Sequence, residues 1–455
     1  MTSPNWQTIR HHSGDIIRLA VPTIASRAGF MIMMIVDTVM VGHYSASELA
    51  YQSIGLAPMM FIMVASFGLL TGTMVVTAYN RGAKLHHECG PVWWRSIYYA
   101  IILGLIGLSL SLFGEEFLAL TGQSNELVKG GGSIIRILGF GVPPMFIYVA
   151  SAFFLEGLKR PLFAMYMMVA GNIVNAGLNW VLIFGHFGMP EMGAEGSAWA
   201  TVGVRTFLAT CIIIYVWNLP DRLELGIPNR PKFLFNSGWQ AWRQQRKIGY
   251  GAGVSNGLES AAFSSMSLMA GVLGVLSLAS YSIAFNMLAL VYMIALGFGS
   301  ATAVCVGNAH GRKDFRDMAY AGWIGLGLTM LTMAVFGMGL QIFNAQIAAG
   351  FTGDAELAKL AAPLIAFIAI VAVADGGQSI MAHALRGRGE TWSPAAMHVV
   401  SYLVIMIPLA WYLAHSINRG ARGLFESILI ASLVSLTLLS FQFWRLSRRD
   451  QQRAL

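Results

Sequence analysis

Charged residues are scarce in this sequence: they make up 11 % of its 455 residues, whereas 56 % are hydrophobic. Soluble domains carry about 25 % charged residues, and a chain of this length could not cover a soluble surface with so few. The three cysteines, Cys89, Cys211 and Cys305, stand far apart and have no partner at metal-ligand spacing. The H-E-x-x-H zinc motif is absent, and we expect no enzymatic activity. The composition leaves a membrane protein as the expected class.

Long apolar runs take up most of the chain. Each approaches the roughly 20 residues that cross the hydrocarbon core as a helix. The first run carries Arg27 and Asp37 and has no small-residue cleavage site, so we expect it to remain as the first helix. The runs predict an all-α membrane protein with twelve transmembrane helices, at residues 16–42, 49–79, 92–113, 131–157, 162–187, 194–218, 247–272, 281–309, 317–343, 358–385, 392–415 and 421–445.

Basic residues alternate between the junctions of these segments. If the N-terminus lies in the cytoplasm, about 22 of the 29 lysines and arginines fall at cytoplasmic ends, as the positive-inside pattern requires. We therefore expect both termini in the cytoplasm. The net charge of +8 follows from this topology and does not indicate nucleic-acid binding.

The two halves of the sequence repeat the same landmarks. Four pairs are displaced by 229 residues: Gly42 with Gly271, Leu49 with Leu278, Gly82 with Gly311, and Lys84 with Lys313. Two later pairs are displaced by 227 residues: Leu158 with Leu385, and Gly193 with Gly420. We expect two six-helix lobes at residues 1–218 and 247–455, joined by a cytoplasmic linker at 219–246. Because each lobe has an even number of spans, a pseudo-two-fold axis along the membrane normal should relate them.

Three acidic residues fall inside predicted membrane spans: Asp37, Glu259 and Asp375. Each costs at least about 2.5–3.5 kcal/mol at the centre of a bilayer, so each needs a partner or a function. One interpretation is a structural ion pair with Arg27 or Arg205. The other is reversible protonation or cation binding, which would couple transport to an ion gradient.

Polar and aromatic side chains surround these acids in the predicted helices. Asn172, Asn175 and Asn179 share one face of the fifth segment, and Thr201 on the sixth could join them. Such amides form either buried hydrogen bonds or an ion site. Around the second-half acids, Phe263, Met266 and Tyr292 are predicted to form an adaptable surface for organic cations. The same cavity could include Asn172. The isolated histidines His310, His383 and His398 are interpreted as having no special role.

Several stretches resemble the multidrug and toxic compound extrusion (MATE) family, and the resemblance covers essentially the whole chain. They are Leu19–Pro22, Val36–His43, Asn172–Asn179 with Gly185, Gly193–Thr201, and Val304–Gly311. Glu259 together with Asp375 resembles the NorM-like bacterial branch. The resemblance implies the MATE fold and export of organic cations across the bacterial inner membrane, in exchange for H⁺ or Na⁺.

The resemblance also implies roles for individual residues. By that analogy the cation sites of the two lobes consist of Asp37, Asn175, Asn179 and Thr201 in the first and of Glu259 and Asp375 in the second. Pro22 would mark a bend in the first helix. We expect a monomer whose partners are small organic cations and the lipid bilayer. No cofactor is expected besides the coupling ion, and no metal except Na⁺ at the coupling site.

Two departures from the family pattern stand out. Val371 precedes Asp375 by one turn, where we expect an aromatic hydroxyl, and Gly249–Gly253 opens the seventh segment where many relatives carry a proline. The main alternative function is a flippase or exporter of a lipid-linked or anionic metabolite. Such a protein should line its cavity with several basic residues, and only Arg27 and Arg205 are candidates here.

Overall fold

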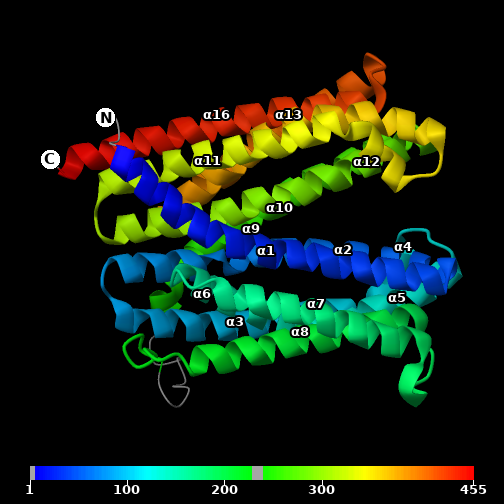
Figure 1. Cartoon of the computed structure of the whole chain (residues 1–455), viewed down its shortest axis with the longest axis horizontal. Helices are drawn as coiled ribbons and strands as arrows, with labels where there is room; N and C mark the ends of the chain where they lie inside the picture. Colours follow the sequence, from blue (N-terminus) through cyan, green and yellow to red (C-terminus); the bar gives the residue numbers. More distant parts are fainter. Residues whose placement is uncertain (1–5, 228–238, 455) are drawn as a thin grey trace. The chain divides into compact units, whose positions relative to one another are not determined.

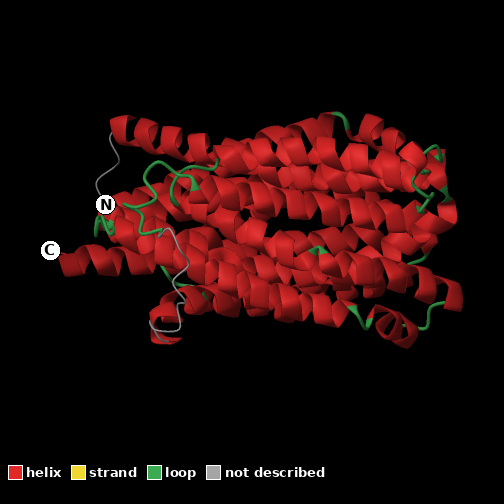
Figure 2. Ribbon diagram, turned by 90° about the horizontal axis from the view of Figure 1, so that it is seen from below, coloured by secondary structure: helices red, strands yellow, loops and turns green. Residues whose placement is uncertain are grey.

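A computed structural model describes residues 6–227 and 239–454 of the chain. In these residues the regular structure is helical throughout, with short connections (Figures 1 and 2). The chain divides into two compact units. The first unit is Ala25–Gly249, and the second combines the start of the chain, up to Ile24, with the residues from Tyr250 onward. The predicted first lobe, residues 1–218, includes the start of the chain, which here groups with the second unit. The predicted lobe boundaries stay a prediction.

The first unit is built from the helices that begin before residue 200, except that the start of the first helix, up to Ile24, belongs to the second unit. They are α1 (Trp6–Tyr44), α2 (Ala46–Gly82), α3 (Cys89–Ser111), α4 (Gly114–Leu120), α5 (Asn125–Phe140), α6 (Val142–Gly157), α7 (Leu162–Phe184) and α8 (Gly193–Trp217). The α5–α6 pair bends by 45° at a break, and Pro143 and Pro144 lie in the first turn of α6. Proline at a first helical turn fixes the backbone for a new helix, since no hydrogen bond is lost there.

The second unit contains the helices from α9 onward. They are α9 (Arg243–Val272), α10 (Val275–Gly311), α11 (Phe315–Ile342), α12 (Asn344–Phe351), α13 (Ala355–Gly387), α14 (Trp392–His398), α15 (Ile407–Trp411) and α16 (Gly420–Ala454). Two π-helical stretches, Val399–Met406 and Tyr412–Ser416, flank α15. Helix α13 packs against α10, α11 and α16, so it lies in the middle of this unit. Asp354 caps the N-terminus of α13 by accepting from the backbone N–H groups of Glu356 and Leu357.

The number of membrane spans differs from the prediction of twelve. Within the described residues, ten helices are long and apolar enough to cross a membrane, or eleven if the bent α5–α6 pair counts as one span. Helix α9 covers the predicted seventh span and is 30 residues long, but it is not among them. Its serines and Glu259 lower its apolar content. Each predicted segment can be matched to a helix or to consecutive helices, but length and composition support ten or eleven spans, so the count of twelve is not confirmed.

The internal repeat is visible in where corresponding helices of the two halves begin and end. Helices α2 and α10 both contain 37 residues, and both of their boundaries differ by the predicted 229 positions. Lys84 and Lys313 follow them with left-handed φ angles of 59° and 61°. The pairing of Leu158 with Leu385 is wrong, because left-handed residues after α6 and α13, Lys159 and Gly389, are 230 positions apart. The sequence match there was a coincidence of a common residue type.

Helix α1 belongs to both units. Pro22 lies inside it, two residues before the division that follows Ile24. Because proline has no N–H group, the carbonyl of Arg18 loses its usual partner one turn earlier. The hydroxyl of Thr23 donates to the carbonyl of Leu19 over 2.9 Å, in the same turn. A bend at Pro22 stays a prediction, while the placement of this proline beside the division of the chain is observed.

The predicted linker at 219–246 is only partly described. Residues 228–238, with Pro228 and Pro231, lie outside the described residues. The preceding stretch is packed: Leu225 and Ile227 are buried, and the carbonyl of Leu225 accepts from the N–H of Gly90 over 2.6 Å. This part of the segment is therefore anchored to the first unit.

Candidate functional site

Asp37 is the centre of a buried polar site in the first unit. Asn175 and Asn179 of α7 donate their Nδ2 groups to its Oδ1 over 3.0 and 2.6 Å, and the hydroxyl of Thr201 of α8 donates to its Oδ2 over 3.1 Å. All four side chains are at most 7 % exposed. Three donors directed at one carboxylate stabilise its ionised form, because hydrogen bonds to a charged group are stronger than neutral ones. The structure thus brings together all four residues predicted for this site.

The site contains oxygen atoms that suit a proton or a cation. Besides the two carboxylate oxygens of Asp37, the Oδ1 atom of Asn179 is buried and has no hydrogen-bond partner. A buried amide oxygen without a partner is costly unless a proton donor or a cation occupies the adjacent space. Carboxylate and amide oxygens are hard ligands that suit a proton or an alkali cation.

Asn172 does not belong to the Asp37 site, although it shares the helix face. Its Nδ2 group donates to the backbone carbonyls of Gly29 and Met168, over 3.1 and 2.9 Å. A Cβ atom at Gly29 would lie 2.3 Å from the side chain of Met168, so α1 and α7 approach closely there. Asn172 therefore fastens α7 to α1 two turns before Asn179.

Glu259 and Asp375 form a second site, in the second unit, where Asp375 is buried and Glu259 is partly exposed. The Nε2 group of Gln378 donates to Glu259 Oε1 and to Asp375 Oδ1, each over 3.2 Å. The hydroxyl of Tyr292 lies 3.4 Å from Glu259 Oε1 and 3.2 Å from the hydroxyl of Ser379. One amide thus bridges the two carboxylates, and residues from α9, α10 and α13 meet around them.

The hydroxyl groups around Asp375 come from helices that sequence reasoning did not single out. Tyr402 and Ser432 donate to its Oδ1 over 3.4 and 3.2 Å. Val371, where an aromatic hydroxyl was expected, is fully buried in the apolar core of this unit. The aromatic hydroxyl is therefore present, but it reaches Asp375 from Tyr402, 27 residues later.

A buried chain of polar side chains continues from Gln378. Its Oε1 atom lies 3.1 Å from His398 Nε2, and His398 Nδ1 lies 2.8 Å from the hydroxyl of Ser255. Ser255 in turn accepts from Arg386 Nη2 over 2.9 Å, and Arg386 also donates to Asn256 over 3.0 Å. His398, interpreted from the sequence as having no special role, is thus part of the network that holds the acids.

The Ser255–His398 contact does not form a hydrolytic site. Gly253–Gly257 has the pattern G-x-S-x-G, but these residues lie within helix α9. In hydrolases that pattern forms a sharp turn between a strand and a helix, which exposes the serine. Here Ser255 is fully buried and its hydroxyl oxygen faces a guanidinium group.

The residues predicted to line a substrate cavity have different surroundings. Tyr292 contacts Glu259, and the ring of Phe263 lies 5.8 Å from that of Tyr402 and 5.9 Å from that of Phe285. Met266 is fully buried in the apolar core and accepts a hydrogen bond from Ser427. Tyr292 and Phe263 therefore lie next to the acids, whereas Met266 packs inside the unit.

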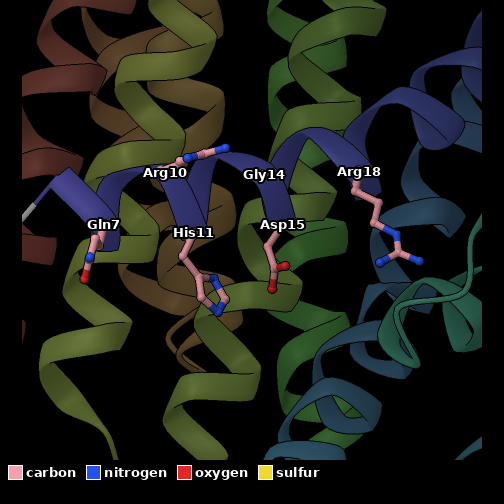
Figure 3. A pocket seen from close by; sticks show the side chains of 6 residues that line it. All are labelled: Gln7, Arg10, His11, Gly14, Asp15 and Arg18. Atoms are coloured by element: carbon pink, nitrogen blue, oxygen red, sulfur yellow. The ribbon is translucent and has the colours of Figure 1, made fainter.

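An open groove of about 500 Å³ lies along the first turns of α1 (Figure 3). Its lining consists of Gln7, Arg10, His11, Gly14, Asp15 and Arg18. These residues all come from one helix, and none belongs to either acid site. Within the described part of the chain, no group of three or more His, Cys, Asp and Glu side chains could hold a metal ion.

Comparison with known proteins places this geometry in a family. The MatE family model matches the chain twice, at residues 22–181 and 252–412, once in each half. The chain belongs to the MATE family. A probable multidrug resistance protein NorM from Caulobacter vibrioides is 37 % identical over 441 residues, which cover 97 % of this chain and 93 % of that protein.

Solved MATE structures have the same fold. An outward-facing multidrug resistance MATE transporter of the MOP superfamily superimposes with a TM-score of 0.89 at 19 % identity, covering 99 % of this chain and 100 % of that one. The eukaryotic MATE transporter AtDTX14 gives 0.87 at 18 % identity, covering 98 % and 100 %. This MATE protein is accordingly a multi-pass membrane transporter and not an enzyme.

Proposed function

We propose that this MATE transporter is a secondary active antiporter that exports organic cations, including drugs, in exchange for protons. The observation that carries the proposal is that each unit holds its own hydrogen-bonded carboxylate site, buried Asp37 in one and buried Asp375 with partly exposed Glu259 in the other. Ionisable groups inside a membrane protein are expensive, and they are characteristic of ion pathways and proton relays. The names of the NorM relatives support multidrug efflux.

Protonation would change the hydrogen bonding of each site. Ionised Asp37 accepts from three donors, whereas protonated Asp37 has one oxygen that must itself donate. The Oδ1 of Asn179, which has no hydrogen-bond partner, could accept that proton if the amide turned its oxygen toward Asp37. An inward proton moving through about 100 mV supplies about 2.3 kcal/mol, which a rearrangement of α1, α7 and α8 could couple to cation export.

Sodium is the alternative coupling ion, because the same oxygen atoms would suit it. An exporter of lipid-linked or anionic metabolites is the alternative function. Its support comes from partly buried Arg27, 3.9 Å from Glu156, and buried Arg205, whose Nη1 has no hydrogen-bond partner, in the first unit, and from buried Arg386 near the second acid site. The three acids at the candidate sites favour a cationic substrate, because Arg386 is held by Ser255 and Asn256 and Arg27 lies beside Glu156.

The proposal also covers the protein's oligomeric state, location and partners. The protein would act as a monomer in a bacterial inner membrane, with both termini in the cytoplasm. It would need no cofactor besides its coupling ion. Nucleic acid would not be a partner.

The proposal is tested in proteoliposomes with a fluorescent organic cation, under a pH gradient or a Na⁺ gradient imposed separately. We expect a pH gradient to drive cation movement and a Na⁺ gradient to have little effect. Asp37→Asn and Asp375→Asn should each abolish the driven movement. Glu426→Gln is the matched control, because Glu426 pairs with Arg419 over 2.7 Å outside both sites. Transport at the wild-type rate by either Asp variant would refute the proposed coupling sites. Cation movement driven by a Na⁺ gradient alone would identify Na⁺, and not H⁺, as the coupling ion.

A further inference from the structure

In the buried chain from Arg386 to the second acid site, each hydrogen bond is donated toward the acids. Arginine can only donate hydrogen bonds, so Ser255 accepts one from Arg386. The hydroxyl of Ser255 can then donate a hydrogen bond to His398 Nδ1. His398 Nε2 then carries the hydrogen and donates to Gln378 Oε1. The Nε2 group of Gln378 is left to donate to Glu259 and Asp375.

Reversing this direction creates unfavourable contacts. If His398 carried its proton on Nδ1, its bare Nε2 atom would face the carbonyl oxygen of Gln378 at 3.1 Å, two acceptors in contact. If the Gln378 amide also rotated, its oxygen would face two carboxylate oxygens. A doubly protonated His398 would add a second buried cation with only Ser255 between it and Arg386.

We propose that His398 is a positioning residue for the second acid site: by donating to Gln378 Oε1 it holds the Gln378 amide group against Glu259 and Asp375. This inference rests on the proposed ion-coupled transport. A glutamine side chain alone can rotate and present either its oxygen or its nitrogen. With His398 donating on one side, and Ser435 donating to the same Oε1 over 3.5 Å, the nitrogen is directed at the acids.

The surroundings of the acids leave Gln378 as the group that bridges both. Tyr292 of α10 reaches Glu259, and Tyr402 reaches Asp375. Among the described residues, the charged and titratable groups that hydrogen-bond along this chain are these two tyrosines, the two acids, His398 and Arg386. Helix α16 contributes the hydroxyls of Ser432 and Ser435. Loss of the donor at His398 would therefore act through Gln378, not by direct contact with a carboxylate.

Transport rates of four variants test the interaction between His398 and Gln378. His398→Phe removes the donor, Gln378→Leu removes the bridge, and both changes are then combined. We expect each single change to slow proton-driven cation movement by about 10-fold or more, the usual scale for groups that orient a site. Because both act on one interaction, the double variant should be no slower than Gln378→Leu. His398→Gln, which restores an N–H donor, should recover most of the rate.

His383→Gln is the matched control. His383 is also buried in this unit, but its Nδ1 atom contacts the backbone carbonyl of Ser379, 2.8 Å away, outside the chain of side chains. We expect a nearly unchanged rate. If the effects of His398→Phe and Gln378→Leu multiply in the double variant, or if His398→Phe transports like the wild type, the inference is wrong.

A second measurement is independent of transport. In wild-type protein labelled with ¹⁵N-histidine, the His398 signal, identified by its loss in His398→Gln, should show a neutral ring protonated on Nε2. A ring protonated on Nδ1 or on both nitrogens would overturn the inference, even if a variant fails to fold. Failure of the proposed function is recognised separately, because the wild-type protein would then move no cation under a pH gradient.

Discussion

Asn179 donates to Asp37 over 2.6 Å, the shortest of the three hydrogen bonds that this carboxylate accepts. The same amide nitrogen lies 3.2 Å from the Oδ1 atom of Asn175, so the two amides support each other one turn apart on α7. Asn179 therefore both stabilises the ionised form of Asp37 and fixes the position of its neighbour.

Asn179→Leu should impair transport far more than Asn172→Leu. A hydrogen bond to a charged group contributes about 1.5–3 kcal/mol, which corresponds to a loss of about 10-fold or more in the rate of a step that needs ionised Asp37. Asn172 contacts only backbone carbonyls, so its change should lower stability and leave coupling intact. Proteoliposome flux and thermal unfolding, measured on both variants, separate the two effects. Equal losses of flux would show that Asn172 also serves the ion site.

The ion pair between Arg160 and Asp221 predicts a pH dependence of stability. It is bidentate, with both contacts at 2.8 Å, and it lies in connections outside the membrane spans. The hydrogen bonds from Arg160 lower the pKa of Asp221 below its ordinary value of 3.8, although partial burial opposes this. A carboxyl with a lowered pKa in the folded state stabilises the protein at neutral pH, and this stabilisation is lost as the pH falls through that folded-state value.

The measurement compares thermal unfolding of the wild-type protein with that of Asp221→Asn from about pH 6 to about pH 3. Near pH 6 the wild type should be slightly more stable, by at most about 1 kcal/mol, because both side chains are partly exposed. The difference should shrink below pH 3.8. A difference that stays constant over this range would mean that Asp221 contributes through packing and not through its charge.

Pro22→Ala should slow transport without weakening the fold. Proline inside a helix costs about 3 kcal/mol by removing a hydrogen bond and crowding the preceding turn, so alanine should raise the unfolding temperature. If α1 must bend where the chain passes from one unit to the other, a straighter helix should reduce the transport rate. Pro58→Ala in α2 is the control, because α2 lies entirely within the first unit. Equal rates in wild-type and Pro22→Ala protein would rule out a functional bend at Pro22.

The sequence was sufficient to locate the acids and much of the first site. The cost of charge in lipid singled out Asp37, Glu259 and Asp375, and helical spacing put Asn175 and Asn179 on one face. Spacing could not exclude Asn172, because whether an amide meets a side chain or a backbone carbonyl depends on which helix packs there.

The second site was harder to predict because its parts come from separate helices. Tyr402 and His398 lie more than twenty positions from Asp375 in the sequence. They meet it across packed helices, and no local pattern records such a contact. The same holds for Arg386, which the alternation of basic residues marked only as part of a cytoplasmic junction. Only its hydrogen bond to Ser255 reveals its place in the network.

Gly297→Val should lower the stability of the second unit. A Cβ atom at Gly297 in α10 would lie 2.2 Å from the side chain of Ile24 and 3.0 Å from its backbone nitrogen. The backbone cannot retreat like a flexible side chain, so α1 would have to move away from α10. Overpacking of this kind costs about 1–3 kcal/mol. Gly327→Val in α11 is the control, because a Cβ atom there meets nothing within 4 Å. Thermal unfolding of both variants in detergent checks this, and equal unfolding temperatures would show that α1 does not need this close contact.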